Sequence, residues 1–223
     1  MGYIFDFSSV LDYSAVLLKG IGITIELILV GGIFGVMLGI LCAWTRSFGP
    51  KWGRWIVTAY VELIRNTPFL VQLFFVFFGL PTLGFRLSEM QSASLAMVLN
   101  LGAYSSEIIR AGIQATAKGQ FEAGASLGMT RLQTFRYVVL LPSLQRIWPA
   151  LSSQIVIVML GSAVVSQIAV EDLSFAANFI QSRNFRAFEM YFVTTVIYLA
   201  LSFLLRQLLT QLGNRLFARR AVR

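Results

Sequence analysis

Residues 122–128 read Glu-Ala-Gly-Ala-Ser-Leu-Gly, and residues 139–142, further along the same amphipathic segment, read Val-Leu-Leu-Pro. Long apolar stretches flank this segment on both sides. Its first part favours a short helix that ends near Gly128, because glycine accepts the left-handed backbone found after many helix C-termini.

A second helix is expected directly after it. Thr130 stands three residues before Gln133, the spacing at which a capping box satisfies two backbone N–H groups at a helix start. The helix should therefore run from Arg131 to about Leu141. Pro142 should end it, since proline has no N–H to donate to the helix. The whole segment is predicted to be two short helices joined by a hinge.

The composition indicates an all-α membrane protein. Hydrophobic residues make up 57% of the 223 residues, charged residues make up 13%, and the mean hydropathy is +0.75. Soluble domains carry about 25% charged residues. The length allows one transmembrane domain, residues 1–223, and no sizeable soluble module. The net charge of +8 comes from basic residues at the ends of apolar segments, which indicates membrane orientation and no nucleic-acid partner.

The residue types also exclude several kinds of chemistry. The chain has no His, and its one cysteine, Cys42, lies in an apolar run and is expected to be a packing residue. We therefore expect no His/Cys metal site, no disulfide and no Cys-His nucleophile, and we assign no catalytic residue to the chain. No Gly-x-x-x-x-Gly-Lys-Ser/Thr motif is present, so no cofactor or nucleotide should bind this chain. Residues 1–19 lack a basic start, so we expect no cleavable signal peptide.

Five segments are long enough to cross a hydrocarbon core about 30 Å thick, which takes roughly 20 helical residues. They are residues 21–44, 56–80, 87–109, 150–168 and 190–212.

Most of the 18 Lys and Arg residues fall on one side of such a five-span chain, which predicts that this side is cytoplasmic. The N-terminus is then periplasmic. The C-terminus and a loop at residues 118–142, between spans three and four, are cytoplasmic. The basic residues on that side are Arg46, Lys51, Arg54, Arg110, Lys118, Arg131, Arg136, Arg146, Arg206, Arg215, Arg219, Arg220 and Arg223.

The cytoplasmic loop resembles the "EAA" loop of ABC-transporter inner-membrane permeases, whose pattern is Glu-Ala-Ala, a Gly four residues later, and a following Ile-x-Leu-Pro. Glu122, Ala123, Gly128 and residues 141–142 match it. Gly124 replaces the second Ala. This change is expected to be harmless, because both residues are small, at a cost of roughly 1 kcal/mol in helix propensity. The proline also lies one residue further from Gly128 than is usual, which affects only the exit angle of the next helix.

Two further stretches, residues 60–73 and residues 103–113, are similar to the polar amino acid uptake branch, which imports histidine, glutamine, glutamate, arginine and opines. The resemblance covers about residues 21–212. It implies the permease subunit of an ATP-driven, binding-protein-dependent importer in the bacterial inner membrane. An importer of another small polar solute, such as an opine or an amino acid derivative, is the alternative.

The resemblance also implies partners: two copies of an ABC ATPase that binds ATP and Mg, and a periplasmic solute-binding protein. A two-fold ATPase pair needs two loops of this kind, so a second permease chain, identical or paralogous, should assemble with this one in the lipid bilayer. The transport cycle would be alternating access between the two sides of the membrane.

Within this family, Glu122, Ala123, Gly124 and Gly128 belong to the coupling helix, which docks into the ATPase. Read from the residues alone, the segment has a simpler interpretation. It would then be an amphipathic helix-turn-helix that lies on the lipid headgroups.

A second candidate group lies in the second span. Glu62 and Arg65 stand one turn apart and could pair with each other. Thr67 and Pro68 suggest an N-cap followed by proline at the first helical position, so the helix should bend or restart there. This group is either a cytoplasmic gate hinge or an ion pair at the membrane surface beside a proline kink.

The substrate pathway should be lined by uncharged polar groups near mid-membrane. Asn100, Gln154, Ser162 and Ser166 have the right depth. Each is also suited to a hydrogen bond between helices.

The first span carries glycines at every fourth position, Gly31, Gly35 and Gly39, a spacing that lets helices approach closely. These residues are interpreted as a packing surface.

Two other classes of function are alternatives to a permease. An intramembrane enzyme would need carboxylates at one depth, but Glu26 lies near the outer face while Glu62 and Glu107 lie near the inner face. An assembly or signalling protein would use the 118–142 loop for docking only, and transport by the reconstituted protein would distinguish it from a permease.

Overall fold

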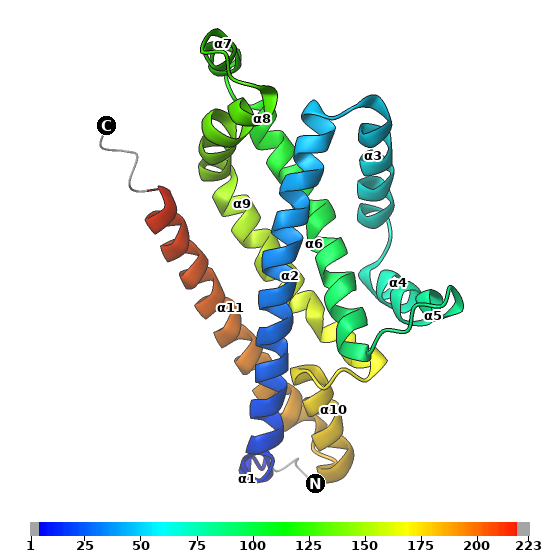
Figure 1. Ribbon diagram of the computed structural model, residues 1–223. Helices are drawn as coiled ribbons and strands as arrows, with labels where there is room; N and C mark the ends of the chain where they lie inside the picture. Colours follow the sequence, from blue (N-terminus) through cyan, green and yellow to red (C-terminus); the bar gives the residue numbers. More distant parts are fainter. Residues whose placement is uncertain (1–4, 218–223) are drawn as a thin grey trace.

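A long helix near the N-terminus, α2, runs through the length of the molecule beside α6 (Figure 1). The computed structural model describes residues 5–217, and all regular elements in that range are helical. Arg219, Arg220 and Arg223 lie outside this range. The elements are α1 (Ser8–Leu11), α2 (Ser14–Phe48), α3 (Lys51–Arg65), α4 (Phe69–Phe74), η1 (Phe75–Gly79), α5 (Leu80–Thr82), α6 (Glu89–Gln114), α7 (Lys118–Ser126), α8 (Arg131–Gln133), η2 (Thr134–Val139), α9 (Leu140–Gly161), η3 (Ser162–Ile168), α10 (Leu173–Asn184) and α11 (Ala187–Phe217).

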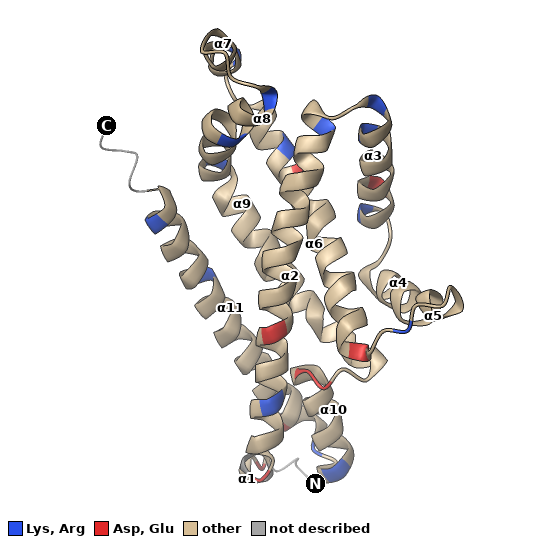
Figure 2. Cartoon of the chain, viewed as in Figure 1, with Lys and Arg blue, Asp and Glu red and all other residues tan. Residues whose placement is uncertain are grey.

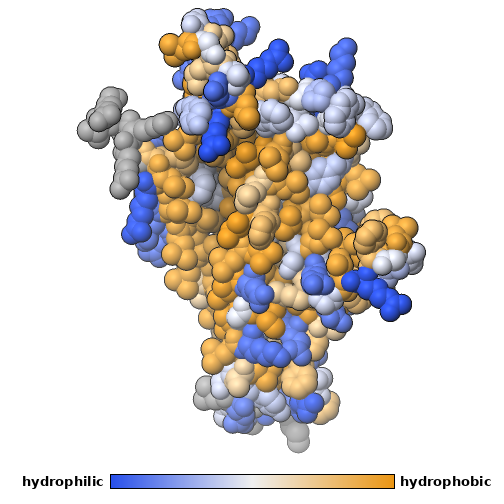
Figure 3. Space-filling model, viewed as in Figure 1, coloured by the Kyte–Doolittle hydropathy of each residue, from blue (hydrophilic) through white to orange (hydrophobic). Residues whose placement is uncertain are grey.

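Three helical stretches are long and apolar enough to cross a membrane: Ser14–Phe48, Arg131–Ile168 and Ala187–Phe217. A fourth results if Lys51–Arg65 and Phe69–Thr82 are taken as one bent span. α6 has 26 residues but is not among these apolar stretches. Hydrophobic residues cover the middle of the surface in Figure 3, and hydrophilic ones gather toward its ends. The chain is therefore an all-α membrane protein, as predicted.

The predicted glycine packing surface lies between α2 and α6. Gly31, Gly35 and Gly39 are all buried. A Cβ atom added to Gly35 would lie 2.8 Å from Leu101 Cβ, and one added to Gly39 would overlap Ser105. The absence of side chains at these positions lets the two helices approach closely. Cys42 is buried further along α2, which fits its interpretation as a packing residue.

The predicted second span, residues 56–80, is not one straight helix. α3 ends at Arg65, and the chain turns by 114° before the stretch Phe69–Thr82. The break falls at Thr67 and Pro68, but the prediction of Thr67 as N-cap is wrong. Pro68 occupies the N-cap position, and Thr67 Oγ1 instead donates backward to the Leu63 carbonyl at 2.8 Å.

Pro142 does not end a helix, contrary to the prediction, because α9 continues through it to Gly161. A proline removes one backbone hydrogen bond, and its ring crowds the carbonyl four residues earlier, here that of Val138. Val138 belongs to η2, a π-helical segment. In a π turn a carbonyl pairs with the N–H five residues later, so a carbonyl in this segment does not depend on the N–H that Pro142 lacks. The apolar stretch runs on from Arg131 to Ile168.

A buried carboxylate, that of Asp172, forms hydrogen bonds between helices at the end of the molecule that carries α1 and α10. Asp172 caps α10 by accepting a hydrogen bond from the Phe175 N–H at 2.9 Å, and the Tyr198 hydroxyl donates to it at 3.2 Å. Thr24 of α2 accepts a hydrogen bond from the Leu173 N–H. Burial raises the pKa of Asp172 to about 6. These bonds join α2, α10 and α11.

Charged residues divide unevenly between the two ends. In Figure 2, Lys and Arg residues are frequent on α3, α8 and the ends of α2 and α6 nearest α7, while the middle of the molecule carries few charges. Acidic residues are more frequent toward the α10 end.

Candidate functional site

The segment predicted to couple to an ATPase forms a helical hairpin, α7 and α8, that projects at one end of the molecule (Figure 1). Gly128 follows α7 with a φ of +68°, the left-handed conformation expected from the sequence. Thr130 and Gln133 form the predicted capping box at the start of α8, with the Gln133 N–H 3.3 Å from Thr130 Oγ1 and the Thr130 N–H 2.8 Å from Gln133 Oε1. Local sequence signals therefore specify this hairpin.

Gly124 has a more specific role than the sequence indicated. It is buried on α7. A Cβ atom added there would lie 2.7 Å from Thr134 Cγ2 and 2.8 Å from Thr134 Oγ1. Thr134 occupies the space that an alanine methyl group would need, so glycine at this position lets α7 pack against η2 rather than being merely tolerated.

The hairpin is attached to the rest of the molecule by aromatic and polar contacts. Phe48, at the end of α2, packs against Phe121 and Phe135, with ring centroids 6.1 and 5.7 Å away. The Thr116 and Ser143 hydroxyls are hydrogen-bonded at 3.0 Å. The hairpin and the residues that flank it are therefore packed against α2 and α9.

The outer side of the hairpin is exposed. Glu122 and Ala123 are exposed on α7, and Leu127 is 78% exposed at its end. An exposed carboxylate and a large exposed apolar side chain on the same hairpin give it the mixture of charge and apolar area that a protein partner can bury.

A cavity of about 460 Å³ lies beside the break between α3 and α4. It brings together four of the predicted residues: Asn100 and Gln154 from the pathway set, and Thr67 and Pro68 from the hinge set. The predicted pathway residues Ser162 and Ser166 do not line it. Their hydroxyls donate to backbone carbonyls within their own helical stretch, those of Met159 and Ala163.

Sequence reasoning missed Gln72, which joins these groups. Its side-chain Nε2 lies 2.7 Å from the Ile64 carbonyl oxygen, in the last turn of α3, and 2.9 Å from the Thr67 carbonyl oxygen, in the break that follows. Its Oε1 accepts a hydrogen bond from Asn100 Nδ2 at 2.9 Å. Gln72 is 8% exposed. Gln72 therefore stabilises the break and, through Asn100, connects it to α6.

The pairing of Glu62 with Arg65 that their spacing allows is not found. Glu62 is exposed, and its carboxylate accepts a hydrogen bond from the side-chain Nδ2 of Asn66 at 3.2 Å. Arg65 instead faces Glu107 of α6, at 3.8 Å.

Glu107 binds arginines from three helices. It accepts hydrogen bonds from Arg46 of α2, at 2.6 Å, and from Arg110 of α6, and it also faces Arg65 of α3. One carboxylate thus connects α2, α3 and α6 at the end of the molecule nearest the hairpin. Three cations around one partly buried carboxylate form a network, which is worth more than an isolated surface ion pair.

Over the described residues, no group of three or more His, Cys, Asp and Glu side chains is placed to hold a metal ion.

This chain is similar in sequence to several known transport permeases. The glutamine transport system permease protein GlnP of Escherichia coli is 32% identical over 214 residues, which cover 95% of this chain and 98% of the relative. The L-cystine transport system permease protein TcyB of Bacillus subtilis is 38% identical over 191 residues, covering 85% and 82% of the two chains. The arginine transport system permease protein ArtQ of Bacillus subtilis is 33% identical over 201 residues, covering 90% and 92%.

Its fold is also similar to those of solved transporter structures. A crystal structure of an amino acid ABC transporter with histidines matches with a TM-score of 0.84 and 35% identity, covering 96% of this chain and all of that one. The MetNI methionine ABC transporter, at 20% identity and a TM-score of 0.75, shares the fold. Residues 35–218 match the family model for the inner membrane component of binding-protein-dependent transport systems. This chain therefore belongs to the family of binding-protein-dependent transport system inner membrane components.

Proposed function

We propose that this chain is the transmembrane permease subunit of an ATP-driven, binding-protein-dependent importer of polar amino acids in the bacterial inner membrane. The named relatives carry glutamine, cystine and arginine, and the matching crystal structure is of an amino acid transporter. A cavity of about 460 Å³ with amide groups and no charged lining residue suits passage of a polar zwitterion.

The proposed topology has five spans in one permease domain, residues 1–223. The three apolar stretches supply three spans. α6 is the fourth, because 26 helical residues reach about 39 Å, and the bent pair α3 and Phe69–Thr82 is the fifth. The excess of Lys and Arg near the α7 end supports a cytoplasmic hairpin and C-terminus with a periplasmic N-terminus.

The exposed α7–α8 hairpin carries the proposal. Glu122 and Ala123 would contact an ABC ATPase, while Gly124 and Gly128 would fix the shape of the hairpin. Phe48, Phe121 and Phe135 connect the hairpin to α2 and η2, so a shift of α7 reaches the membrane helices through packed rings. ATP and Mg would bind the ATPase, and this chain would not itself be an enzyme.

The proposed cycle is alternating access. A periplasmic solute-binding protein delivers the amino acid, and closure of two ATPase copies pushes the hairpins of two permease chains, identical or paralogous. The break at Thr67 and Pro68, with Glu62 and Arg65 before it, would act as the gate hinge. Asn100 and Gln154 would line the route, while Ser162 and Ser166 would support it through their backbone bonds.

Two substitutions in the hairpin test this proposal. Glu122→Lys reverses the charge at the contact. Gly128→Val places a β-branched residue at a φ of +68°, which costs roughly 1–2 kcal/mol. Both variants should enter the membrane normally, lose most uptake in proteoliposomes, and either release the ATPase or leave its hydrolysis unresponsive to loaded binding protein.

Gln120→Lys is the matched control, because residue 120 is exposed on α7 but lies about 200° around the helix from Glu122. It should retain uptake. Normal uptake and normal binding-protein-stimulated hydrolysis in both Glu122→Lys and Gly128→Val would contradict a coupling role for the hairpin.

A further inference from the structure

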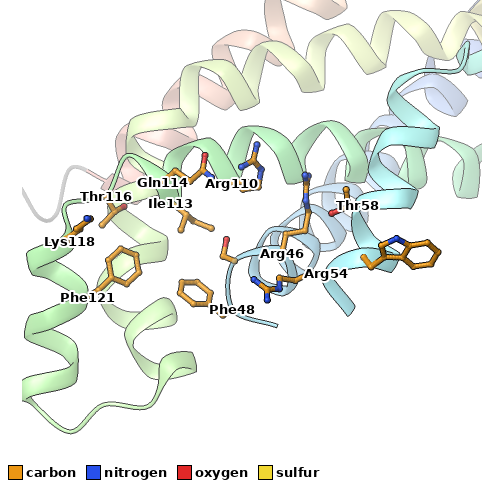
Figure 4. A pocket seen from close by; sticks show the side chains of 12 residues that line it. Arg46, Phe48, Arg54, Thr58, Arg110, Ile113, Gln114, Thr116, Lys118 and Phe121 are labelled. Carbon is orange, nitrogen blue, oxygen red and sulfur yellow. The ribbon is translucent and has the colours of Figure 1, made fainter. Parts of the chain in front are cut away.

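A larger cavity, of about 710 Å³, lies where the end of α2, the start of α3, the end of α6 and α7 meet (Figure 4). Each of these four elements contributes one basic side chain to its lining, Arg46, Arg54, Arg110 and Lys118 respectively. The cavity is separate from the one beside the break. Phe48 and Phe121 of its lining belong to the ring contact described above, while its four basic side chains have no role in the transport cycle proposed above.

The basic side chains outnumber the acidic groups that neutralise them. Glu107 forms ion pairs with two of the four, Arg46 and Arg110. Arg54 and Lys118 are exposed, and neither forms an ion pair with any residue that the structure describes. Two cations from different helices therefore face a cavity that contains no counter-charge for them, and such an arrangement attracts an anion.

The neighbouring residues indicate which anion. Trp52 and Trp55 of α3 are 70% and 74% exposed, and Trp55 lines the cavity. Exposed tryptophans collect at the membrane–water interface, where the ring is in contact with lipid and the N–H with water. With the hairpin in the cytoplasm, as the proposed function has it, the cavity opens at the headgroup level of the cytoplasmic leaflet, which is rich in anionic lipid.

We propose that this cavity binds the phosphate group of an anionic phospholipid such as phosphatidylglycerol. The Arg54 guanidinium can donate two parallel hydrogen bonds to phosphate oxygens, and the Lys118 ammonium supplies a second charge from the other side. Thr58 and Gln114 offer further donors from the lining. The bound lipid would bridge α3 and α7.

Lipid retention tests the site directly. The permease with its ATPase is placed in nanodiscs of equal phosphatidylglycerol and phosphatidylcholine, released, and the lipids retained per permease are counted by native mass spectrometry. The wild-type chain should retain phosphatidylglycerol preferentially. Arg54→Gln combined with Lys118→Gln should lower this preference by roughly 30-fold, which corresponds to about 1 kcal/mol for each cation near an anionic surface.

The control pair is Lys51→Gln combined with Arg131→Gln. It removes the same charge from α3 and from the hairpin, at exposed positions that do not line the cavity, and it should keep the preference. An unchanged preference in the Arg54 and Lys118 variant, or an equal loss in the control pair, would overturn the proposal.

Two further readouts separate other occupants. If radiolabelled inorganic phosphate binds the complex in neutral detergent, and binds the Arg54 and Lys118 variant much less, the site takes a soluble phosphate compound and the lipid assignment is wrong. If the variant retains lipid normally but loses its ATPase, the cavity belongs to the ATPase interface instead. Retention does not depend on transport, so failure of the proposed importer function would leave this result interpretable.

Discussion

Gly32 and Gly39 lie seven residues apart on α2 in different surroundings. A Cβ atom at Gly32 would meet no atom within 4 Å, whereas one at Gly39 would overlap Ser105 and lie 3.0 Å from the Ser106 backbone nitrogen. Backbone cannot move aside as a flexible side chain can. Gly39→Ala should therefore lower the stability of the detergent-solubilised protein by about 1–3 kcal/mol, the usual cost of overpacking.

Thermal unfolding followed by fluorescence measures this difference, with Gly32→Ala as the control. Alanine is the better helix former by up to about 1 kcal/mol, so Gly32→Ala should keep or raise the unfolding midpoint. Equal midpoints for the two variants would show that the contact between α2 and α6 is looser than the structure indicates.

Gly124 and Thr134 form a second residue pair with a testable dependence. Gly124→Ala alone should disturb the hairpin and reduce ATPase retention, because its methyl group would lie 2.7 Å from Thr134 Cγ2. Thr134→Ala removes both the methyl and the hydroxyl group that stand in the way. The double variant should therefore recover retention in a pull-down of the ATPase, and failure to recover would mean that the clash is not the cause.

Among the elements, the break between α3 and α4 depends on side chains from outside it. Gln72 donates to carbonyl groups at the end of α3 and accepts from Asn100. Gln72→Leu would remove the acceptor of the buried Asn100 amide and the closest side-chain donor to the Ile64 and Thr67 carbonyls, at roughly 1–3 kcal/mol for each buried group left unpaired. Its unfolding midpoint should fall clearly.

Gln154 provides the comparison, because it lines the same cavity but forms no hydrogen bond with a described residue. Gln154→Leu should keep the unfolding midpoint of the wild-type protein while lowering amino acid uptake in proteoliposomes. Normal uptake by a stable Gln154→Leu variant would remove this residue from the proposed pathway.

The proposed topology is the prediction that belongs to the whole molecule. In a Cys42→Ser background, single cysteines at Gln133 and Asn214 should react with impermeant reagents only from the cytoplasmic side. One at Ser182 of α10 should react from outside. Asn214 is used because the neighbouring Gly213 packs against Trp148, where a side chain would not fit. Labelling of the Gln133 position in intact cells would contradict the orientation.

The hairpin could be predicted from sequence because its signals are local. A left-handed glycine at Gly128 and a capping box at Thr130 each depend on neighbouring residues only. The role of Gln72 could not be predicted, because its partner Asn100 is 28 positions away and its acceptors exist only where the chain breaks. Arg65 likewise faces Glu107 on another helix instead of Glu62 on its own, a choice that packing makes and spacing does not reveal.

The close contact between α2 and α6 has a consequence for how this protein is made. α6 is less apolar than the other long helices, and buries polar side chains such as Ser92 and Asn100. A helix of this composition partitions weakly into lipid when it leaves the translocon alone. α2 is synthesised first and already presents Gly31, Gly35 and Gly39 as a surface on which α6 fits. With α6 as a span, as proposed, we expect α2 to assist the insertion of α6 during synthesis. Damage to the glycine face of α2 should then lower the amount of protein found in the membrane.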